Sequence, residues 1–378
     1  MLPRVVARIR WKVLPIVLIV VFLLAGCGSM PTGGWSSPIV VQNVLYYGST
    51  DGKVYALDAT SGSLYWKFPV KDEKEQETTS FLFWQRTGDM LIQLGSIYST
   101  PAVHDGYLYI GAYNHKVYAL DAISGARKWN FKTGAEIVSS PVVVSDTVYI
   151  GSSDHKVYAL DASTGDKKWE FDTGQKVWAD PVVEGGVVYV GSLGHKVYSL
   201  DATTGSKRWE FTTSGAVGAS LTLTDGTLYV GALSTLLALD ADSGTEKWEF
   251  TAGNWIWSRP AVAGGTVYVG SLDHKVYALD ANSGRKLWEV TTGGPVCSAP
   301  VVSGETVYVG SQDFKLYALD ATNGVTKWEF TTKGRINATP TVTGDLVYVN
   351  SLDKTLYALD AATGQKRWTF VPTEQGGQ

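Results

Sequence analysis

Four histidines recur at equivalent places along the chain, and they are the side chains best suited to bind a metal. Imidazole nitrogen is a common zinc ligand, held at about 2 Å from the ion. Each of these histidines precedes a lysine in a predicted turn, and each lies in a different copy of a repeated unit. We expect equivalent positions on different units to lie roughly 10 Å or more apart, too far to share one ion. The sequence therefore predicts no zinc site at His115, His155, His195 and His274.

Side chains that could bind calcium through oxygen are few and scattered. Glu136, Asp180 and Asn337 fall in the third, fourth and eighth units, whereas Ca²⁺ takes about six to eight oxygen ligands. No Ser-His-Asp order, glycine-rich phosphate loop or set of paired Cys ligands is visible in the sequence. We therefore predict no catalytic residues and no metal site.

A motif that occurs eight times must position all of these side chains. It consists of an Asp, a Gly four residues later and a Trp eight residues after the Asp. Successive motif Trp residues are 63, 40, 40, 39, 40, 40 and 40 positions apart, which indicates a repeat of about forty residues with one insertion. The Asp can accept backbone N–H groups in a turn, the Gly permits a positive φ, and the Trp can pack on the neighbouring unit. The eight predicted docking residues are Trp66, Trp129, Trp169, Trp209, Trp248, Trp288, Trp328 and Trp368.

Each unit is predicted to form four short strands and no helix. In the third unit the strands are expected at 139–144, 147–151, 156–160 and 168–171, with turn signals between them. Four-stranded units repeated radially leave only short, protected sheet edges. The sequence therefore predicts an all-β fold, an eight-bladed β-propeller of four-stranded antiparallel blades.

The run Tyr-Ala-Leu-Asp-Ala-x-Thr/Ser-Gly-x-x-x-Trp resembles the tryptophan-docking motif of the quinoprotein (PQQ-type) propeller family. That family includes quinoprotein alcohol dehydrogenases and the outer-membrane assembly lipoprotein BamB, and the resemblance extends from Trp35 to Pro372. A dehydrogenase of this family would hold PQQ on the axis with a calcium ion, a catalytic Asp and a disulfide between adjacent cysteines. This chain has no adjacent cysteines. The resemblance therefore implies a BamB-like protein without a cofactor, and PQQ with calcium is the alternative.

The N-terminal segment indicates export from the cytoplasm. Four basic residues precede an apolar run from Val13 to Ala25, a pattern typical of a secretory signal peptide. Leu-Ala-Gly followed by Cys27 resembles a bacterial lipobox, which implies cleavage before Cys27 and lipidation of its sulfur. The alternative is an uncleaved anchor helix with an incidental Cys. The predicted division is a signal peptide at 1–26, a lipid-anchored linker at 27–34, a propeller at 35–372 with an insertion at 71–94, and a tail at 373–378.

Charge and cysteine content narrow the range of partners. The formal net charge is −4, and it becomes −8 when the four basic residues of the signal peptide are removed. An acidic mature chain argues against nucleic acid or an anionic membrane surface as a partner. Cys27 and Cys297 are the only cysteines, so lipidation of the first leaves no disulfide within the mature chain. Cys297 is interpreted as a small buried residue.

Every second position of the segments that enter the inner strands varies between units, and these positions form the candidate binding face. When the units are aligned on the Pro of the inner strand, the residue two positions earlier is always small. The alternate positions vary and are expected to point toward the mouth of the channel. Trp beside Arg is typical of recognition surfaces, although these rings could instead plug the channel or pack on the insertion. The predicted binding face comprises Trp35, Trp84, Tyr98, Trp178, Asp180, Trp255, Trp257, Arg259, Arg335 and Asn337.

These observations predict a monomeric propeller that is lipid-anchored in the bacterial cell envelope, at the outer membrane or the outer face of the cytoplasmic membrane. We expect it to bind an envelope protein or a polymer as a non-catalytic scaffold. The alternatives are a PQQ- and calcium-dependent periplasmic oxidoreductase and an extracellular carbohydrate-binding or sensor lipoprotein. The insertion begins with the charged stretch 71–77, expected to be a solvated loop, and then turns apolar at 81–84, where it must fold onto the blades or meet a partner.

Overall fold

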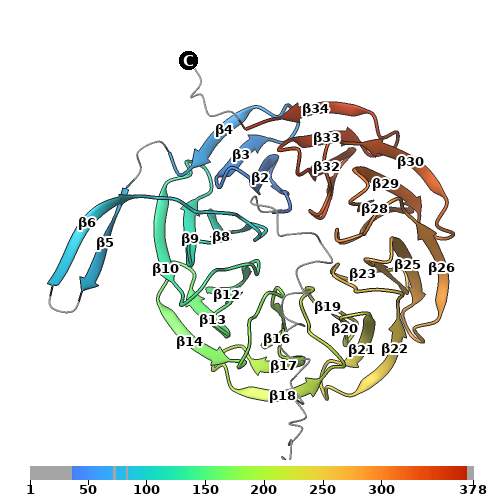
Figure 1. Cartoon of the computed structure of the whole chain (residues 1–378), viewed down its shortest axis with the longest axis horizontal. Helices are drawn as coiled ribbons and strands as arrows, with labels where there is room; N and C mark the ends of the chain where they lie inside the picture. Colours follow the sequence, from blue (N-terminus) through green and yellow to red (C-terminus); the bar gives the residue numbers. More distant parts are fainter. Residues whose placement is uncertain (1–35, 71–73, 82–83, 373–378) are drawn as a thin grey trace, which may run out of the picture. The chain divides into compact units, whose positions relative to one another are not determined.

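The computed structural model describes residues 36–70, 74–81 and 84–372. In these ranges the chain forms eight four-stranded antiparallel sheets arranged as the blades of a ring (Figure 1), and one separate two-stranded sheet. Each blade is built from one consecutive stretch of sequence. The predicted all-β, eight-bladed propeller is therefore confirmed. Within the same ranges no helix is long and apolar enough to cross a membrane.

The strands of the first four blades run from the axis outward in chain order. Blade one contains β1 (Ile39–Val41), β2 (Val44–Gly48), β3 (Val54–Asp58) and β4 (Leu64–Phe68). Blade two contains β7 (Ala102–His104), β8 (Tyr107–Gly111), β9 (Lys116–Asp121) and β10 (Arg127–Lys132). Blade three contains β11 (Val142–Val144), β12 (Thr147–Gly151), β13 (Lys156–Asp161) and β14 (Lys167–Asp172). Blade four contains β15 (Val182–Glu184), β16 (Val187–Ser192), β17 (Lys196–Asp201) and β18 (Lys207–Thr212).

The other four blades repeat this order. Blade five contains β19 (Thr222–Thr224), β20 (Thr227–Ala232), β21 (Thr235–Asp240) and β22 (Glu246–Thr251). Blade six contains β23 (Ala261–Ala263), β24 (Thr266–Gly270), β25 (Lys275–Asp280) and β26 (Lys286–Thr291). Blade seven contains β27 (Val301–Ser303), β28 (Thr306–Gly310), β29 (Lys315–Asp320) and β30 (Thr326–Thr331). Blade eight contains β31 (Thr341–Thr343), β32 (Leu346–Asn350), β33 (Leu356–Asp360) and β34 (Lys366–Phe370).

The inner strands are shorter than the sequence suggests. In blade three the strand was expected at 139–144, but β11 begins at Val142, immediately after Pro141. Proline has no N–H to donate to a ladder, and the serine before it takes over part of the pairing. The hydroxyl of Ser139 accepts the N–H of Gly151 at 3.3 Å. The same contact is made by the equivalent Ser of blades one, two, six and seven, whereas blades four, five and eight have Ala there.

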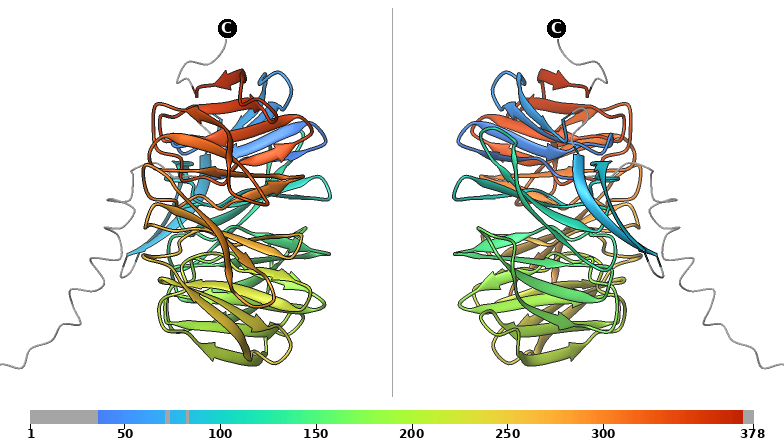
Figure 2. Two further views of the ribbon diagram at one scale, coloured as in Figure 1. Left: turned by 90° about the vertical axis from the view of Figure 1, so that its right-hand side faces the viewer. Right: turned by 90° about the vertical axis from the view of Figure 1, so that its left-hand side faces the viewer.

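The core consists of separate apolar layers between adjacent blades. Between blades two and three, for example, the buried side chains Tyr109 and Trp129 pack with Val148, Ile150 and Leu160. Figure 2 shows the ring edge-on, so that the strand ends form two opposite faces. Burial between blades leaves the loops at these faces free to vary in sequence.

The ring closes between blades eight and one through the same kind of side-chain contact. The indole N–H of Trp368 and the hydroxyl of Tyr348 donate to the carbonyl of Ala59, at 3.1 and 3.0 Å. The side-chain amide of Asn350 donates to the carbonyl of Ser36 at 3.1 Å. Because each described blade is a consecutive segment, closure requires no strand from elsewhere in the chain.

Part of the insertion after blade one forms a hairpin where the charged stretch 71–77 was expected to be a loop. β5 (Lys74–Phe81) and β6 (Trp84–Leu91) pair antiparallel from Lys74 opposite Leu91 to Phe81 opposite Trp84. This hairpin pairs with no blade strand. The residues that follow it re-enter the propeller, because Ile92, Leu94 and Ile97 are buried in the core between blades one and two.

Candidate functional site

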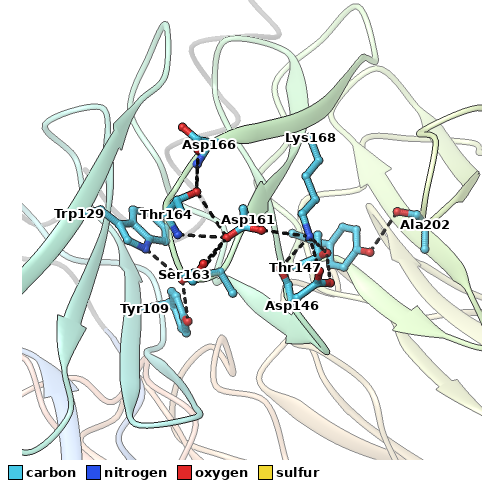
Figure 3. Close-up of polar contacts among 12 residues, drawn as sticks. Tyr109, Trp129, Asp146, Thr147, Asp161, Ser163, Thr164, Asp166, Lys168 and Ala202 are labelled. Carbon is cyan, nitrogen blue, oxygen red and sulfur yellow. Dashed lines mark hydrogen bonds and ion pairs between the residues drawn. The ribbon is translucent and has the colours of Figure 1, made fainter.

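The Asp of the repeated motif organises the turn between the third and fourth strands of each blade. In blade three, Asp161 Oδ1 accepts the N–H groups of Ser163 and Thr164, at 2.9 and 3.1 Å, and the hydroxyl of Ser163 at 2.7 Å (Figure 3). Lys168 Nζ lies 3.6 Å from the other carboxylate oxygen. The Ser163 hydroxyl, the turn amides and Lys168 together lower the pKa of Asp161 to about 2. This carboxylate is fully engaged in holding a turn.

The Trp of one blade docks on the turn of the next. The indole N–H of Trp129 and the hydroxyl of Tyr109 both donate to the carbonyl of Ala162, each at 3.0 Å (Figure 3). The Trp129 ring lies against Gly165, where an added Cβ would come within 2.6 Å of it. Gly165 is thus required both for its φ of 79° and for the ring packed on it.

The same docking bond occurs at every junction between blades, with N–O distances of 2.9–3.1 Å. The bonds run from Trp66 to Ala122, Trp129 to Ala162, Trp169 to Ala202, Trp209 to Ala241, Trp248 to Ala281, Trp288 to Ala321, Trp328 to Ala361 and Trp368 to Ala59. These eight residues therefore form the scaffold.

The loops that enter the inner strands share one face with the turns between second and third strands. In blade three the N–H of Ser153, in such a turn, donates to the carbonyl of Glu136 at 3.0 Å. We call this face the mouth end. The docking turns lie at the opposite end, where the N–H of Ala162 donates to the carbonyl of Asp146 at 2.9 Å.

Three tryptophans of the predicted binding face meet at the mouth end. The rings of Trp178 and Trp257 are 6.4 Å apart between centroids at 69°, and those of Trp255 and Trp257 are 6.5 Å apart at 24°. All three side chains are half-buried. Gly218 of blade five makes room for them, since a Cβ there would lie 3.2 Å from the Trp257 ring. We call Trp178, Trp255 and Trp257 the aromatic cluster.

An ion pair extends the aromatic cluster toward blade three. Lys176 Nζ lies 5.7 Å from the centre of the Trp178 ring and 3.1 Å from Glu136 Oε1. Burial acts to raise the pKa of Glu136, but its backbone hydrogen bond and Lys176 outweigh this and hold the pKa below its usual value. The indole N–H of Trp178 donates to Ser153 Oγ at 2.9 Å, which fixes this ring in place.

Asp180 and Arg259 each directly precede the Pro of their inner strand. The N–H of Ser140 donates to Asp180 Oδ1 at 2.5 Å, and the N–H of Asp180 donates to Ser220 Oγ at 3.2 Å. Burial raises the pKa of Asp180, although these hydrogen bonds and the charge of Arg259 oppose the shift. Arg259 is exposed, and its Nε donates to Thr222 Oγ1 at 3.4 Å.

The remaining predicted residues divide between buried and exposed positions. Tyr98 is only 7% exposed and packs against Tyr113, with ring centres 5.6 Å apart. Asn337 is 5% exposed, and its Oδ1 accepts the side-chain amide of Gln312 at 3.1 Å. Both therefore offer a partner little surface, whereas Arg335 is exposed.

Some predicted positions fall outside what the structure describes. Cys27 and Trp35 precede the described residues, and Trp84 is described only as part of the backbone of β6.

Gln312 was not singled out from the sequence. Its side-chain amide also lies 3.2 Å from the sulfur of Cys297, which is buried and not in a disulfide. Gln312 and Ser153 occupy the same position, two residues after the Gly that ends the second strand. Each contacts the variable residue of the following blade, Asn337 or Trp178. The sequence signal that could have identified Gln312 is the variation between units at this position.

The side chains with metal-binding chemistry do not converge. Among the described residues, no group of three or more His, Cys, Asp and Glu could hold a metal ion. The repeated histidines have positive φ values, from 61° to 77°, and serve turns. Glu136 is engaged by Lys176, Asp180 by the N–H of Ser140, and Asn337 by Gln312. This donor set does not fit a calcium ion with PQQ.

Comparisons with known proteins agree on the architecture. The model of the family described as outer membrane protein assembly factor BamB matches residues 51–210, 172–254, 234–334 and 298–378. The crystal structure of BamB from Moraxella catarrhalis aligns with a TM-score of 0.70 at 20% identity, covering 85% of this chain and 95% of that one. The computationally designed protein Ika8 aligns with a TM-score of 0.72 at 16% identity, covering 87% of this chain and 96% of that one.

The sequence comparison also matches an enzyme. Quinohemoprotein alcohol dehydrogenase ADH-IIG of Pseudomonas putida is 30% identical over 101 residues. The match spans 27% of this chain and 12% of that enzyme. It therefore concerns a few repeats and not the whole of either protein.

Proposed function

Because this chain belongs to the family described as outer membrane protein assembly factor BamB, we propose that it is a non-catalytic scaffold of the bacterial cell envelope. In this role the mouth end of the propeller binds another envelope protein. The lipobox-like sequence before Cys27 supports a lipid anchor that holds the propeller at a membrane. The acidic mature chain makes nucleic acid an unsuitable partner.

The aromatic cluster is the observation that carries this proposal. Three half-buried Trp rings from blades four and six pack against one another, and the exposed Arg259 follows two residues after Trp257 on blade six. Interface energy concentrates in a few Trp, Tyr and Arg side chains, and side chains that are already ordered lower the entropic cost of binding. The rings are held by one another and by Ser153, so a partner would not need to order them. None of the docking contacts between blades involves Trp178, Trp255 or Trp257.

The sequence match to a quinohemoprotein alcohol dehydrogenase favours a second candidate, a PQQ- and calcium-dependent oxidoreductase. Against it stand the engaged donors Glu136, Asp180 and Asn337 and the absence of adjacent cysteines in the sequence. We expect no heat in calorimetry with PQQ and Ca²⁺ at micromolar concentration. A clear heat that Asp180→Ala abolishes would favour the oxidoreductase.

Partner capture tests the scaffold proposal. The full-length protein carrying Trp257→Ala and Arg259→Ala should lose crosslinked partners from its native envelope, while its melting temperature stays within a few degrees of the parent. The matched controls, Asp225→Ala and Asp345→Ala, change turns at the opposite end and should capture normally. Equal capture by the double variant would refute the assignment. Loss of a captured polysaccharide instead of a protein would favour a carbohydrate-binding lipoprotein.

A further inference from the structure

The residues that precede the inner-strand Pro form a hydrogen-bonded ring around the axis. In blade five Leu221 replaces the Pro. At four junctions the N–H of one member donates to a side-chain oxygen of the next: Thr100 to Ser140 at 2.9 Å, Ser140 to Asp180 at 2.5 Å, Asp180 to Ser220 at 3.2 Å and Thr339 to Ser37 at 2.9 Å. We call this set the inner ring. Its eight members are Ser37, Thr100, Ser140, Asp180, Ser220, Arg259, Ala299 and Thr339.

The inner ring lacks acceptors at two consecutive junctions. After Ser220 the next member is Arg259, and after Arg259 it is Ala299. Neither an Arg nor an Ala side chain can accept a hydrogen bond. Within the described part of the chain, no protein oxygen accepts the N–H of Ser220 or of Arg259. The amides of Ser37 and Ala299 likewise have no acceptor among the described residues, but the next member of the ring, Thr100 or Thr339, carries a hydroxyl that can accept a hydrogen bond.

The side chain of Arg259 brings a guanidinium group to the same junction of blades five and six. Among the described residues, the side chain of Arg259 makes one hydrogen bond, from Nε to Thr222 Oγ1. Its terminal nitrogens have no carboxylate within ion-pair distance among the described residues. Two amides and a guanidinium therefore present donors in the same sector of the axis, next to the aromatic cluster. Such donors favour an anionic oxygen ligand.

The neighbouring blades indicate which anion fits. At the junction of blades three and four, the carboxylate of Asp180 accepts the N–H of Ser140 at 2.5 Å. A carboxylate thus already occupies this geometry one sector away. We propose that the amides of Ser220 and Arg259, with the Arg259 guanidinium, bind a carboxylate group. Resting on the proposed function, we assign it to an acidic side chain of the envelope partner, inserted at the mouth end.

Asp180 sets the electrostatic condition for this site. Its charge interacts with that of Arg259, so an ionised Asp180 reduces the attraction for a second carboxylate. Asp180→Asn removes the negative charge but keeps an oxygen that can accept the N–H of Ser140. This variant should therefore bind the carboxylate more tightly than the parent. A purely structural role for the inner ring would not produce that gain.

A site-resolved titration tests the proposal. The full-length ¹⁵N-labelled protein in detergent micelles is titrated with capped Gly-Gly-Glu-Gly-Gly, with the matched Gln peptide, and with succinate. The amide signals of Ser220 and Arg259 should shift saturably with the Glu peptide and stay in place with the Gln peptide. Ala299→Ser supplies the missing acceptor, as Ser140 and Ser220 do in their blades, and should weaken Glu-peptide binding by up to about tenfold.

The outcomes separate this inference from the scaffold proposal. Saturable shifts that Ala299→Ser weakens and Asp180→Asn strengthens support the site. Equal response to the Glu and Gln peptides, no saturation, or unchanged affinity in Ala299→Ser overturns it. Binding of succinate without the Glu peptide overturns the assignment to a partner side chain. Normal shifts together with unchanged partner capture by the Trp257→Ala and Arg259→Ala double variant would instead overturn the scaffold proposal and the assignment to a partner side chain, and would leave only the carboxylate site itself.

Discussion

Two glycines in blade four allow the energy of blade docking to be measured separately from backbone strain. Gly205 and Gly186 have nearly the same backbone conformation, with φ values of 71° and 76°. A Cβ on Gly205 would lie 2.8 Å from the ring of Trp169, whereas a Cβ on Gly186 would have no atom within 4 Å. Alanine in this left-handed region costs roughly 1–2 kcal/mol at either position. Only Gly205→Ala adds a steric conflict between blades.

The conflict at Gly205 cannot be relieved cheaply. Trp169 is buried, and its indole N–H is held at 2.9 Å by the carbonyl of Ala202 in the same turn as Gly205. Overpacking of a well-packed site costs typically about 1–3 kcal/mol. We therefore expect Gly186→Ala to lower the free energy of unfolding by about 1–2 kcal/mol and Gly205→Ala by about 2–5 kcal/mol.

Urea unfolding of the two variants at one temperature gives the comparison directly, provided that fluorescence and circular dichroism transitions coincide. The parent slope should be retained, because neither change alters the surface exposed on unfolding. Equal losses in the two variants would refute the argument that the Trp ring on this Gly holds neighbouring blades together. A larger loss for Gly186→Ala would refute it more strongly.

Three further predictions concern docking, acid stability and anchoring. Trp169→Ala should lower the free energy of unfolding by about 3–5 kcal/mol. Trp178→Ala, at a half-buried position, should lower it far less. Similar decreases for the two variants in urea unfolding would contradict the division into scaffold and binding face. Contacts with turn groups and with a cation lower the pKa values of Asp161 and Asp201 to about 2. The stability that these carboxylates contribute is therefore complete above the pKa of the unfolded chain, near 3.8, and is lost as the pH falls toward 2. The free energy of unfolding, measured across this pH range, should fall less steeply with acid in Asp161→Asn than in the parent. Cys27→Ser should accumulate as an unprocessed precursor without labelled fatty acid, and continued labelling would contradict the lipoprotein proposal.

The scaffold could be predicted because its contacts repeat with the sequence period. The spacing of Asp161, Gly165 and Trp169 specifies a turn and a ring within one unit, and the neighbouring unit supplies the complementary pair. The structure places Trp129 on Gly165 and on the carbonyl of Ala162, which is the relation that the repeat implies. Each such contact is encoded eight times within one chain, so one sequence is enough to identify it.

Contacts at the mouth end could not be predicted in the same detail. The bond from Trp178 to Ser153 and the bond from Gln312 to Asn337 join side chains on different blades that vary independently of the repeat. Burial of Tyr98 likewise depends on Tyr113, which lies in another loop. The hairpin of the insertion was missed because its pairing is local and occurs once. Periodicity carries no information about features that do not recur.

Several departures from the repeat fall together in blades five and six. The fifth unit is one residue shorter, has Leu221 in place of Pro and has Gly218 where other blades carry larger side chains. Blade six supplies Trp257, whose ring packs over Gly218, and also Arg259. Docking contacts are the same at this junction as elsewhere, so the scaffold does not require the difference. These departures coincide with the aromatic cluster and with the two junctions of the inner ring at which the next member offers no acceptor, which is the arrangement that the proposed binding surface requires.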